Sequence, residues 1–265
     1  MNFRLSRIVV YPIKSLDGIS LESTQVLPTS ALANDRRFAM RSARGDWISG
    51  KTNPAVHYLR AHFAVDAASV RLVSEIDGRE AEFVLADDRE QLNAWLADFF
   101  EEPVMVVEND RAGFPDDTDS PGPTIVSRQS IEEVTGWYPG FTVEDVRSRF
   151  RANLEFDGDA PFCEDRLVAD RQHVVRFAIG DVILEGVTAC QRCIVPTRHP
   201  RTAAIYPRFA RLFAEHRQAT LPAWTVTERF DHYYRLTVNT RLSPLTTEGD
   251  IRVGDEVRIL EVVPA

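Results

Sequence analysis

The chain has 265 residues, of which 44% are hydrophobic and 27% charged, values that are ordinary for a globular protein of one large or two modest domains. The formal net charge of -9 argues against broad binding to nucleic acid or to an anionic membrane, because their phosphates would be repelled. No apolar run reaches the roughly 18 residues of a membrane helix, and the N-terminal run IVVYPI is too short for the apolar part of a signal peptide, so we expect an unprocessed cytoplasmic protein.

The first hundred residues are predicted to be mostly β. Gly, Asn, Asp and Pro separate short runs that are rich in Val and Ile or that alternate between apolar and polar residues, at 4–13, 19–27, 38–41, 58–65, 70–73 and 81–84. Many short strands at close spacing favour a barrel or a sandwich over alternating strands and helices. A helix capped by Asp87 or Asp88 follows. Its apolar residues between Leu92 and Phe99 recur at helical spacing.

The middle of the chain contains the best candidate for a domain boundary. Residues 108–123 carry Asp, Gly and Pro without periodicity, which indicates a loop. Ser130 and Glu133 have the spacing of a capping box and predict a helix through Trp137. Further helices are expected at 143–149 and 208–216.

The second half is also predicted to be rich in strands, at 104–107, 125–126, 152–156, 173–184, 234–240 and 256–263. Gly-Asp pairs at 180–181 and 254–255 fit turns between antiparallel strands and favour a barrel. We therefore expect a mainly β protein with a few helices, divided into domains at 1–108 and 109–265.

The functional argument centres on two cysteines three residues apart, Cys190 and Cys193, with Arg192 between them. With Cys163 the chain has three cysteines, too few for a disulfide framework. A zinc site would need a second C-x-x-C or a His pair, and a thiol redox pair would be expected at the start of a helix, whereas 194–196 indicates strand or loop. Two inert, half-buried cysteines are the simplest interpretation. Arg192, however, favours a thiolate on Cys193, the form that binds soft metals.

Three other polar groups stand where an anion could bind. Lys14 and Ser15 follow an apolar strand, and Arg36 lies in a charged cluster before another strand. Each of these alone is ordinarily a solvated surface group. Arg151 and Asn153 are two residues apart in a predicted strand and so point to one face. On a core-lining face, Arg and Asn need a polar ligand or each other.

Six short motifs occur in order over nearly the whole chain: VYPIKS (10–15), DRRF (35–38), FRANL (150–154), PFCED (161–165), CQRC (190–193) and VGDEV (253–257). Each is short, but together they are specific. The chain resembles the MOSC domain family, whose domains are related to the C-terminal part of molybdenum cofactor sulfurases. It is most similar to members with an N-terminal β-barrel extension, such as the mitochondrial amidoxime-reducing component. The resemblance implies a β-rich MOSC barrel with a few helices and an N-terminal barrel-like domain.

The resemblance also implies a cofactor, molybdenum bound through the dithiolene of molybdopterin. The family's metal ligand is the second cysteine of the motif, here Cys193, which is then the catalytic residue, and Cys190 has no required role. The matching cofactor-binding residues are Lys14, Ser15, Arg36, Arg151, Asn153 and Arg192, with looser matches at Thr118, Asp119, Ser120 and Asn239. The basic members would form a pocket for the phosphate of the pterin.

The function implied by the resemblance is reduction of N-hydroxylated or other N-oxygenated small molecules by oxygen-atom transfer. Larger bacterial relatives carry an iron–sulfur domain beyond the region where this chain ends, so we expect a separate flavin or iron–sulfur electron donor. Asp119 and His199 are candidates for proton delivery, although 196–200 departs from the T-x-D-P of relatives. The alternative is a non-catalytic carrier of molybdenum cofactor or of sulfur. A third possibility is a family member that binds nothing.

Overall fold

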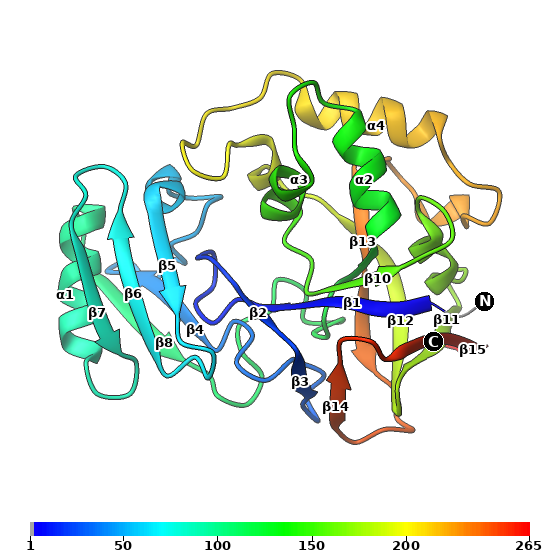
Figure 1. Cartoon of the computed structure of the whole chain (residues 1–265), viewed down its shortest axis with the longest axis horizontal. Helices are drawn as coiled ribbons and strands as arrows, with labels where there is room; N and C mark the ends of the chain where they lie inside the picture. Colours follow the sequence, from blue (N-terminus) through cyan, green and yellow to red (C-terminus); the bar gives the residue numbers. More distant parts are fainter. Residues whose placement is uncertain (1–2) are drawn as a thin grey trace.

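Fifteen strands and four α-helices form within residues 3–265, the part of the chain that the computed structural model describes. They are arranged as two lobes side by side, an N-terminal lobe and a barrel lobe, with the start of β1 (Phe3–Val10) and the end of β15 (Glu256–Pro264) on the side of the barrel lobe away from the N-terminal lobe (Figure 1). The mainly β fold expected from the sequence is confirmed. No helix in this described region is long and apolar enough to cross a membrane.

The barrel lobe is a closed ring of seven strands. In ring order these are β1 (Phe3–Val10), β10 (Leu154–Asp157), β9 (Ile125–Ser127), β13 (Arg235–Leu242), β12 (Val182–Gln191), β11 (His173–Ile179) and β15 (Glu256–Pro264), which returns to β1. Their pairs are antiparallel except β9 with β10. The ring joins the first strand of the chain to the last, so that both ends of the sequence are needed to close it.

The N-terminal lobe consists of two small sheets and a helix. One sheet pairs β4 (Phe38–Ser42) with β8 (Val104–Glu108), the other orders β5 (Leu59–Phe63), β6 (Ser69–Ser74) and β7 (Glu80–Val84), and α1 (Arg89–Phe100) packs beside them. Two further short strands connect the lobes. β2 (Ile19–Leu21) pairs with β1, and β3 (Ser23–Val26) pairs with β14 (Gly249–Arg252), a strand that the sequence pattern did not predict. Strands from the predicted first domain therefore share sheets with the predicted second one.

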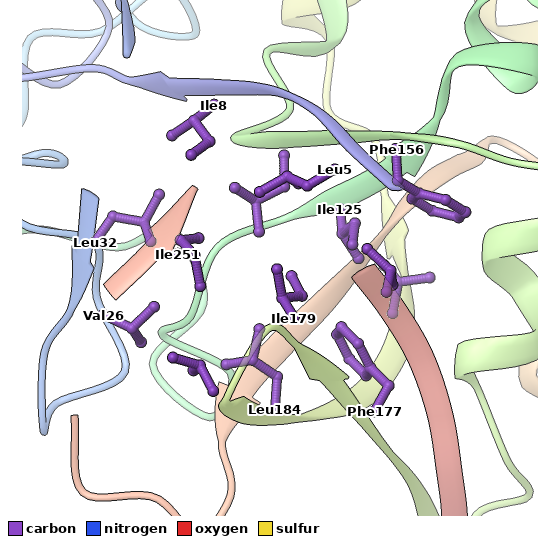
Figure 2. Close-up of a cluster of buried hydrophobic side chains, with 14 of the residues drawn as sticks. Leu5, Ile8, Val26, Leu32, Ile125, Phe156, Phe177, Ile179, Leu184 and Ile251 are labelled. Carbon is purple, nitrogen blue, oxygen red and sulfur yellow. The ribbon is translucent and has the colours of Figure 1, made fainter. Parts of the chain in front are cut away.

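Hydrophobic side chains from opposite ends of the chain fill the barrel (Figure 2). Leu5, Ile125, Phe156, Phe177 and Leu184 point into it from five different strands and are at most 1% exposed. The register requires this arrangement, because alternate residues of each strand point inward. A second core fills the N-terminal lobe. A third lies beneath the helices α2 (Arg128–Gly136), α3 (Val143–Phe150) and α4 (Phe209–Ala219), which cover one side of the barrel (Figure 1).

Asp88 is the N-cap residue of α1, as predicted, but its side chain does not cap the helix. The Asp88 carboxylate accepts a hydrogen bond from the Val84 backbone, 2.8 Å away, and none from the first turn of α1. The N-cap of α2 is Ser127 and not Ser130. The Ser130 hydroxyl instead donates to Glu164 Oε2, 2.7 Å away. The Ser127 side chain caps α2 locally, and the Ser130 hydroxyl belongs to a buried polar cluster with Glu164.

The PFCED motif forms a buried polar cluster and contributes no side chain to the cleft described below. Glu164 is 1% exposed, and its Oε2 accepts from Ser130 while its Oε1 has no partner. Burial, followed by the charge of Asp165, raises the pKa of Glu164 to about 7. Folding therefore favours the protonated acid. The protonated Glu164 side chain contributes to the free energy of unfolding. This contribution is complete below the ordinary pKa of 4.5 and is lost as the pH rises towards 7.

We expect Glu164→Gln to stabilise the protein at pH 8 and to have little effect at pH 5. The amide imitates the protonated acid without the cost of burying a charge. The gain at pH 8 is up to about 3 kcal/mol, since each unit of pKa shift corresponds to about 1.4 kcal/mol. Urea denaturation at both pH values measures it, with Glu132→Gln on the exposed side of α2 as the control. An equal effect of Glu164→Gln at the two pH values would contradict the assignment of a proton to Glu164.

Candidate functional site

A cleft of about 1320 Å³ is lined by residues of both lobes. Ten of the eleven site residues predicted from the sequence line it: Lys14, Ser15, Arg36, Thr118, Ser120, Arg151, Asn153, Arg192, Cys193 and Asn239. Asp119 is exposed and does not line the cleft. His199, a candidate for proton delivery, is also outside the lining. The fold thus brings together nearly all of a set that is spread over more than 220 positions of sequence.

The cleft is positively charged although the chain is acidic. Within residues 3–265, its lining includes twelve Lys or Arg residues and seven Asp or Glu residues, whereas the whole chain has 31 and 40. Cations therefore outnumber acids in the cleft and are outnumbered overall. Such a concentration of donors attracts an anionic ligand and raises its local concentration.

Three of the predicted residues have left-handed backbone. The φ angles of Ser15, Arg36 and Arg151 are 76°, 49° and 52°, in a region that residues other than glycine rarely occupy and that costs about 1–3 kcal/mol each. Arg151 is the C-terminal cap of α3 and precedes β10, which begins at Leu154. The prediction that Arg151 and Asn153 share the face of one strand was therefore wrong. They meet at the cleft because the chain turns sharply between helix and strand.

Arg36 and Arg151 flank one aromatic ring. The guanidinium carbons lie 5.6 Å and 4.0 Å from the centre of the buried Tyr11 ring. The Tyr11 amide donates to Asp35, which also pairs with Arg36, and Arg151 donates to the Leu16 carbonyl at 2.6 Å. Arg36 and Arg151 are thereby held rigidly, and each still has N–H groups for a ligand, because a guanidinium carries five. Tyr11 and Asp35 belong to the VYPIKS and DRRF motifs, but nothing in the sequence showed their contact.

The side chain of Asn153 holds this cluster in place through hydrogen bonds. Its side-chain oxygen accepts from Arg36 and from the Thr124 amide and hydroxyl at 3.2–3.4 Å, and its nitrogen donates to the Val9 carbonyl at 3.1 Å. The residue is 1% exposed. Its contacts fix Arg36 against the barrel, which is a positioning role within the predicted set.

Lys14 forms an ion pair with Asp116, a residue that the sequence analysis did not single out. Lys14 Nζ lies 3.0 Å from Asp116 Oδ1 and 3.0 Å from the Phe114 carbonyl. Desolvation raises the pKa of Asp116, but the attraction of Lys14 and Arg36 outweighs it and lowers that pKa to about 2. Asp116 is therefore ionised throughout the neutral range and competes with an incoming anion for Lys14.

We expect Asp116→Asn to strengthen the binding of inorganic phosphate by up to about fivefold. An exposed ion pair is worth up to about 1 kcal/mol, and the variant releases Lys14 from that competition. Isothermal titration calorimetry at pH 7 measures the change. Asp119→Asn, in the same loop but outside the cleft lining, is the matched control. If Asp116→Asn and the wild type bind phosphate with equal affinity, Lys14 does not contribute to the anion site.

The loop before β9 is anchored on the barrel by Asp117 and Gly122. Asp117 accepts from the amides of Asp119 and Ser120 and from the Asn239 side chain, the last at 2.8 Å. Gly122 donates to the Thr240 carbonyl, and a Cβ on it would lie 2.6 Å from that oxygen. Only glycine permits this approach. The anchoring residue is thus Asp117, immediately before the three that the sequence analysis selected.

The two cysteines have different surroundings. Arg192 Nη1 lies 3.2 Å from Cys190 Sγ, and Nη2 donates to the Phe150 carbonyl at 2.7 Å. Within residues 3–265 no hydrogen bond reaches the sulfur of Cys193, although it is partly exposed in the cleft. The Arg192 guanidinium thus contacts the sulfur of Cys190, and its predicted effect on Cys193 stays a prediction. Cys193 is left as the thiol that is available to a ligand.

The cleft also contains donors without acceptors. Among the described residues, four arginines that line it have a buried Nε–H without a hydrogen-bond partner: Arg149, Arg192, Arg198 and Arg235. Leaving a buried charged donor unpaired is costly. The surplus of cations in the cleft suits a phosphorylated, oxygen-rich ligand, and the Cys193 thiol suits a soft metal.

Two family models match the chain. Residues 2–103 match the MOSC N-terminal beta barrel domain, and residues 117–258 match the MOSC domain. No curated protein matches. A solved structure described as a hypothetical protein is 9% identical, covers 98% of this chain and 69% of its own, and has a TM-score of 0.42. The predicted boundary after residue 108 falls between the two matched ranges and stays a prediction.

Proposed function

Because the chain belongs to the MOSC family, whose domains are associated with binding of molybdenum cofactor, we propose that it binds this cofactor in the cleft and reduces N-hydroxylated small molecules. The observation that carries the proposal is Cys193, whose sulfur has no hydrogen-bond partner among residues 3–265 and which lines a cleft where cations outnumber acids. A cysteine thiolate is a natural ligand for a soft metal, and the surplus of cations suits a phosphate.

The residues of the cleft have separate tasks in this proposal. Cys193 provides the protein's metal ligand, and Lys14, Arg36 and Arg151 hold the phosphate and the polar edges of the pterin. Within the described residues no group of three or more His, Cys, Asp or Glu side chains is arranged to hold a metal ion. The further metal ligands in the proposal therefore come from the dithiolene of the pterin.

The cofactor, when bound, supplies a metal that cycles between two oxidation states and takes the oxygen atom of an N–O bond. The overall reaction consumes the N–OH group, two electrons and two protons and gives N–H and water. The chain's part would be to hold the cofactor through Cys193, Lys14, Arg36 and Arg151 and to admit the substrate through the cleft. Asp116, with its pKa of about 2, is no proton donor at neutral pH.

The test is to purify the full chain from a host that makes molybdenum cofactor and to measure molybdenum and pterin together with turnover of benzamidoxime. Reduced methyl viologen serves as the electron source. Near-stoichiometric metal and formation of benzamidine support the proposal. Metal and pterin without turnover would favour a carrier of the cofactor, and absence of both would refute binding.

A further inference from the structure

Cys193 is reached from two sides of the molecule. One side is the large cleft. The other is a shallow depression of about 460 Å³ that Cys193 and Arg192 line together with residues of the segment before α4, of α4 itself and of the start of β13. We call Ile194, Ile205, Arg208 and Arg211, which line this depression, the α4 face. α4 runs along the outer edge of the barrel lobe, across the lobe from β14 (Figure 1).

The α4 face is cationic. The depression is lined by Arg192, Arg208 and Arg211 and, among the described residues, by no Asp or Glu. Arg211 pairs with Glu215 one turn along the helix, 2.7 Å away, and both side chains remain largely exposed. In a chain with a net charge of -9, a patch of this composition favours an acidic partner.

The same face exposes large apolar side chains beside the metal ligand. Ile194 is 50% exposed and Ile205 is 61% exposed. Ile194 directly follows Cys193, and consecutive Cα atoms are about 3.8 Å apart, so the ligand is one residue away from this surface. Apolar side chains with cations around them are the composition of a protein interface, with an apolar centre and a polar rim.

We propose that the α4 face docks the electron donor, an acidic iron–sulfur protein, while substrate enters through the cleft. This inference rests on the proposed function. The depression is shallow, so the donor's redox centre must itself lie near the donor's surface, as a cluster in a surface loop does. Two reduced carriers each deliver one electron through the side of Cys193, and two protons from solvent complete the conversion of N–OH to N–H and water. A small, charge-steered contact of this kind buries less than about 1,200 Å².

The experiment measures binding of a plant-type [2Fe–2S] ferredoxin to the full chain by isothermal titration calorimetry at 50 mM and 300 mM salt. The variant is Arg208→Glu with Arg211→Glu. The control is Arg252→Glu with Arg258→Glu on β14 and β15, where each exposed arginine also has a carboxylate within 3.7 Å. We expect the dissociation constant to rise at least about tenfold in the α4-face variant, a loss of about 1.4 kcal/mol. For the wild type, the dissociation constant should be higher at 300 mM salt than at 50 mM salt. In the control variant it should differ from the wild-type value by less than about twofold.

A second measurement separates docking from chemistry. The α4-face variant should accept electrons from dithionite at the wild-type rate and from reduced ferredoxin more slowly. Equal ferredoxin affinities in the variant and the wild type, or no ferredoxin binding, overturn the inference. The inference is also overturned if the protein binds flavodoxin in place of ferredoxin. It is likewise overturned if the protein self-associates and Arg208→Glu with Arg211→Glu abolishes that self-association. Metal-loaded wild type that is inert towards benzamidoxime with dithionite overturns the proposed function, while the binding data still decide whether this face docks the carrier.

Discussion

Cys193→Ala is expected to lower the molybdenum content of the purified protein by at least about 100-fold, while Cys190→Ala leaves the content near that of the wild type. Loss of an outer-shell partner of a metal ligand costs roughly 10–100-fold in affinity, and loss of the ligand itself costs at least as much. Inductively coupled plasma mass spectrometry measures molybdenum per chain. Turnover of benzamidoxime should fall in proportion to the metal.

The two cysteines make this a matched comparison. They stand three residues apart and are both partly exposed, but Arg192 donates to the sulfur of Cys190 only. Pterin content measured in the same samples distinguishes loss of the metal from loss of the whole cofactor. Equal molybdenum in Cys193→Ala and the wild type would exclude Cys193 as the ligand, and loss confined to Cys190→Ala would transfer the role to Cys190.

Arg217→Met is expected to lower the free energy of unfolding by about 3–5 kcal/mol, the cost of breaking a buried ion pair from one side. Arg217 is 1% exposed, pairs with Asp165 and lies 3.8 Å from the centre of the Phe162 ring. Asp165 also accepts from the Thr225 hydroxyl at 2.6 Å. The variant leaves Asp165 buried with its charge uncompensated. Urea denaturation at pH 7 measures the loss.

Two further variants test the reason for this loss. Arg211→Met on the same helix removes an exposed ion pair with Glu215 and should cost at most about 0.5 kcal/mol. Arg217→Met combined with Asp165→Leu should recover part of the stability, because no unpaired charge remains. If the double variant is no more stable than Arg217→Met alone, packing around the ring of Phe162 is the dominant contribution, and not the charge.

The positions of strands and helices were largely accessible from the sequence, because they depend on local periodicity. The helices predicted at 143–149 and 208–216 are α3 and α4, and the Gly-Asp pair at 180–181 is the turn between β11 and β12. Strand β14 was missed because its four residues alternate too briefly to be recognised. The cap of α2 was misassigned because the helix begins earlier, with Ser127 as its cap, while the Ser130 hydroxyl donates to buried Glu164, more than thirty residues away along the chain.

Most of the selected residues that line the cleft could also be predicted, because the family motifs preserve residue types at recognisable spacings. The carboxylate that competes for Lys14 could not be predicted. Asp116 lies about a hundred positions after Lys14 in the sequence, and only folding shows that the two residues pair. The anchoring role of Asp117 likewise depends on Asn239, 122 positions later.

By itself the sequence determined the β-rich class, the family and the cysteine pair, since composition, periodicity and short motifs are properties of neighbouring residues. The tertiary structure alone decided which cysteine sulfur is free, because the direction of the Arg192 side chain depends on the Phe150 carbonyl and on Cys190. It also decided that an acidic chain has a cleft with a surplus of cations, because charge at a site depends on which distant segments meet there. Contacts between distant residues are settled by the packing of the whole core, and no local pattern contains that information.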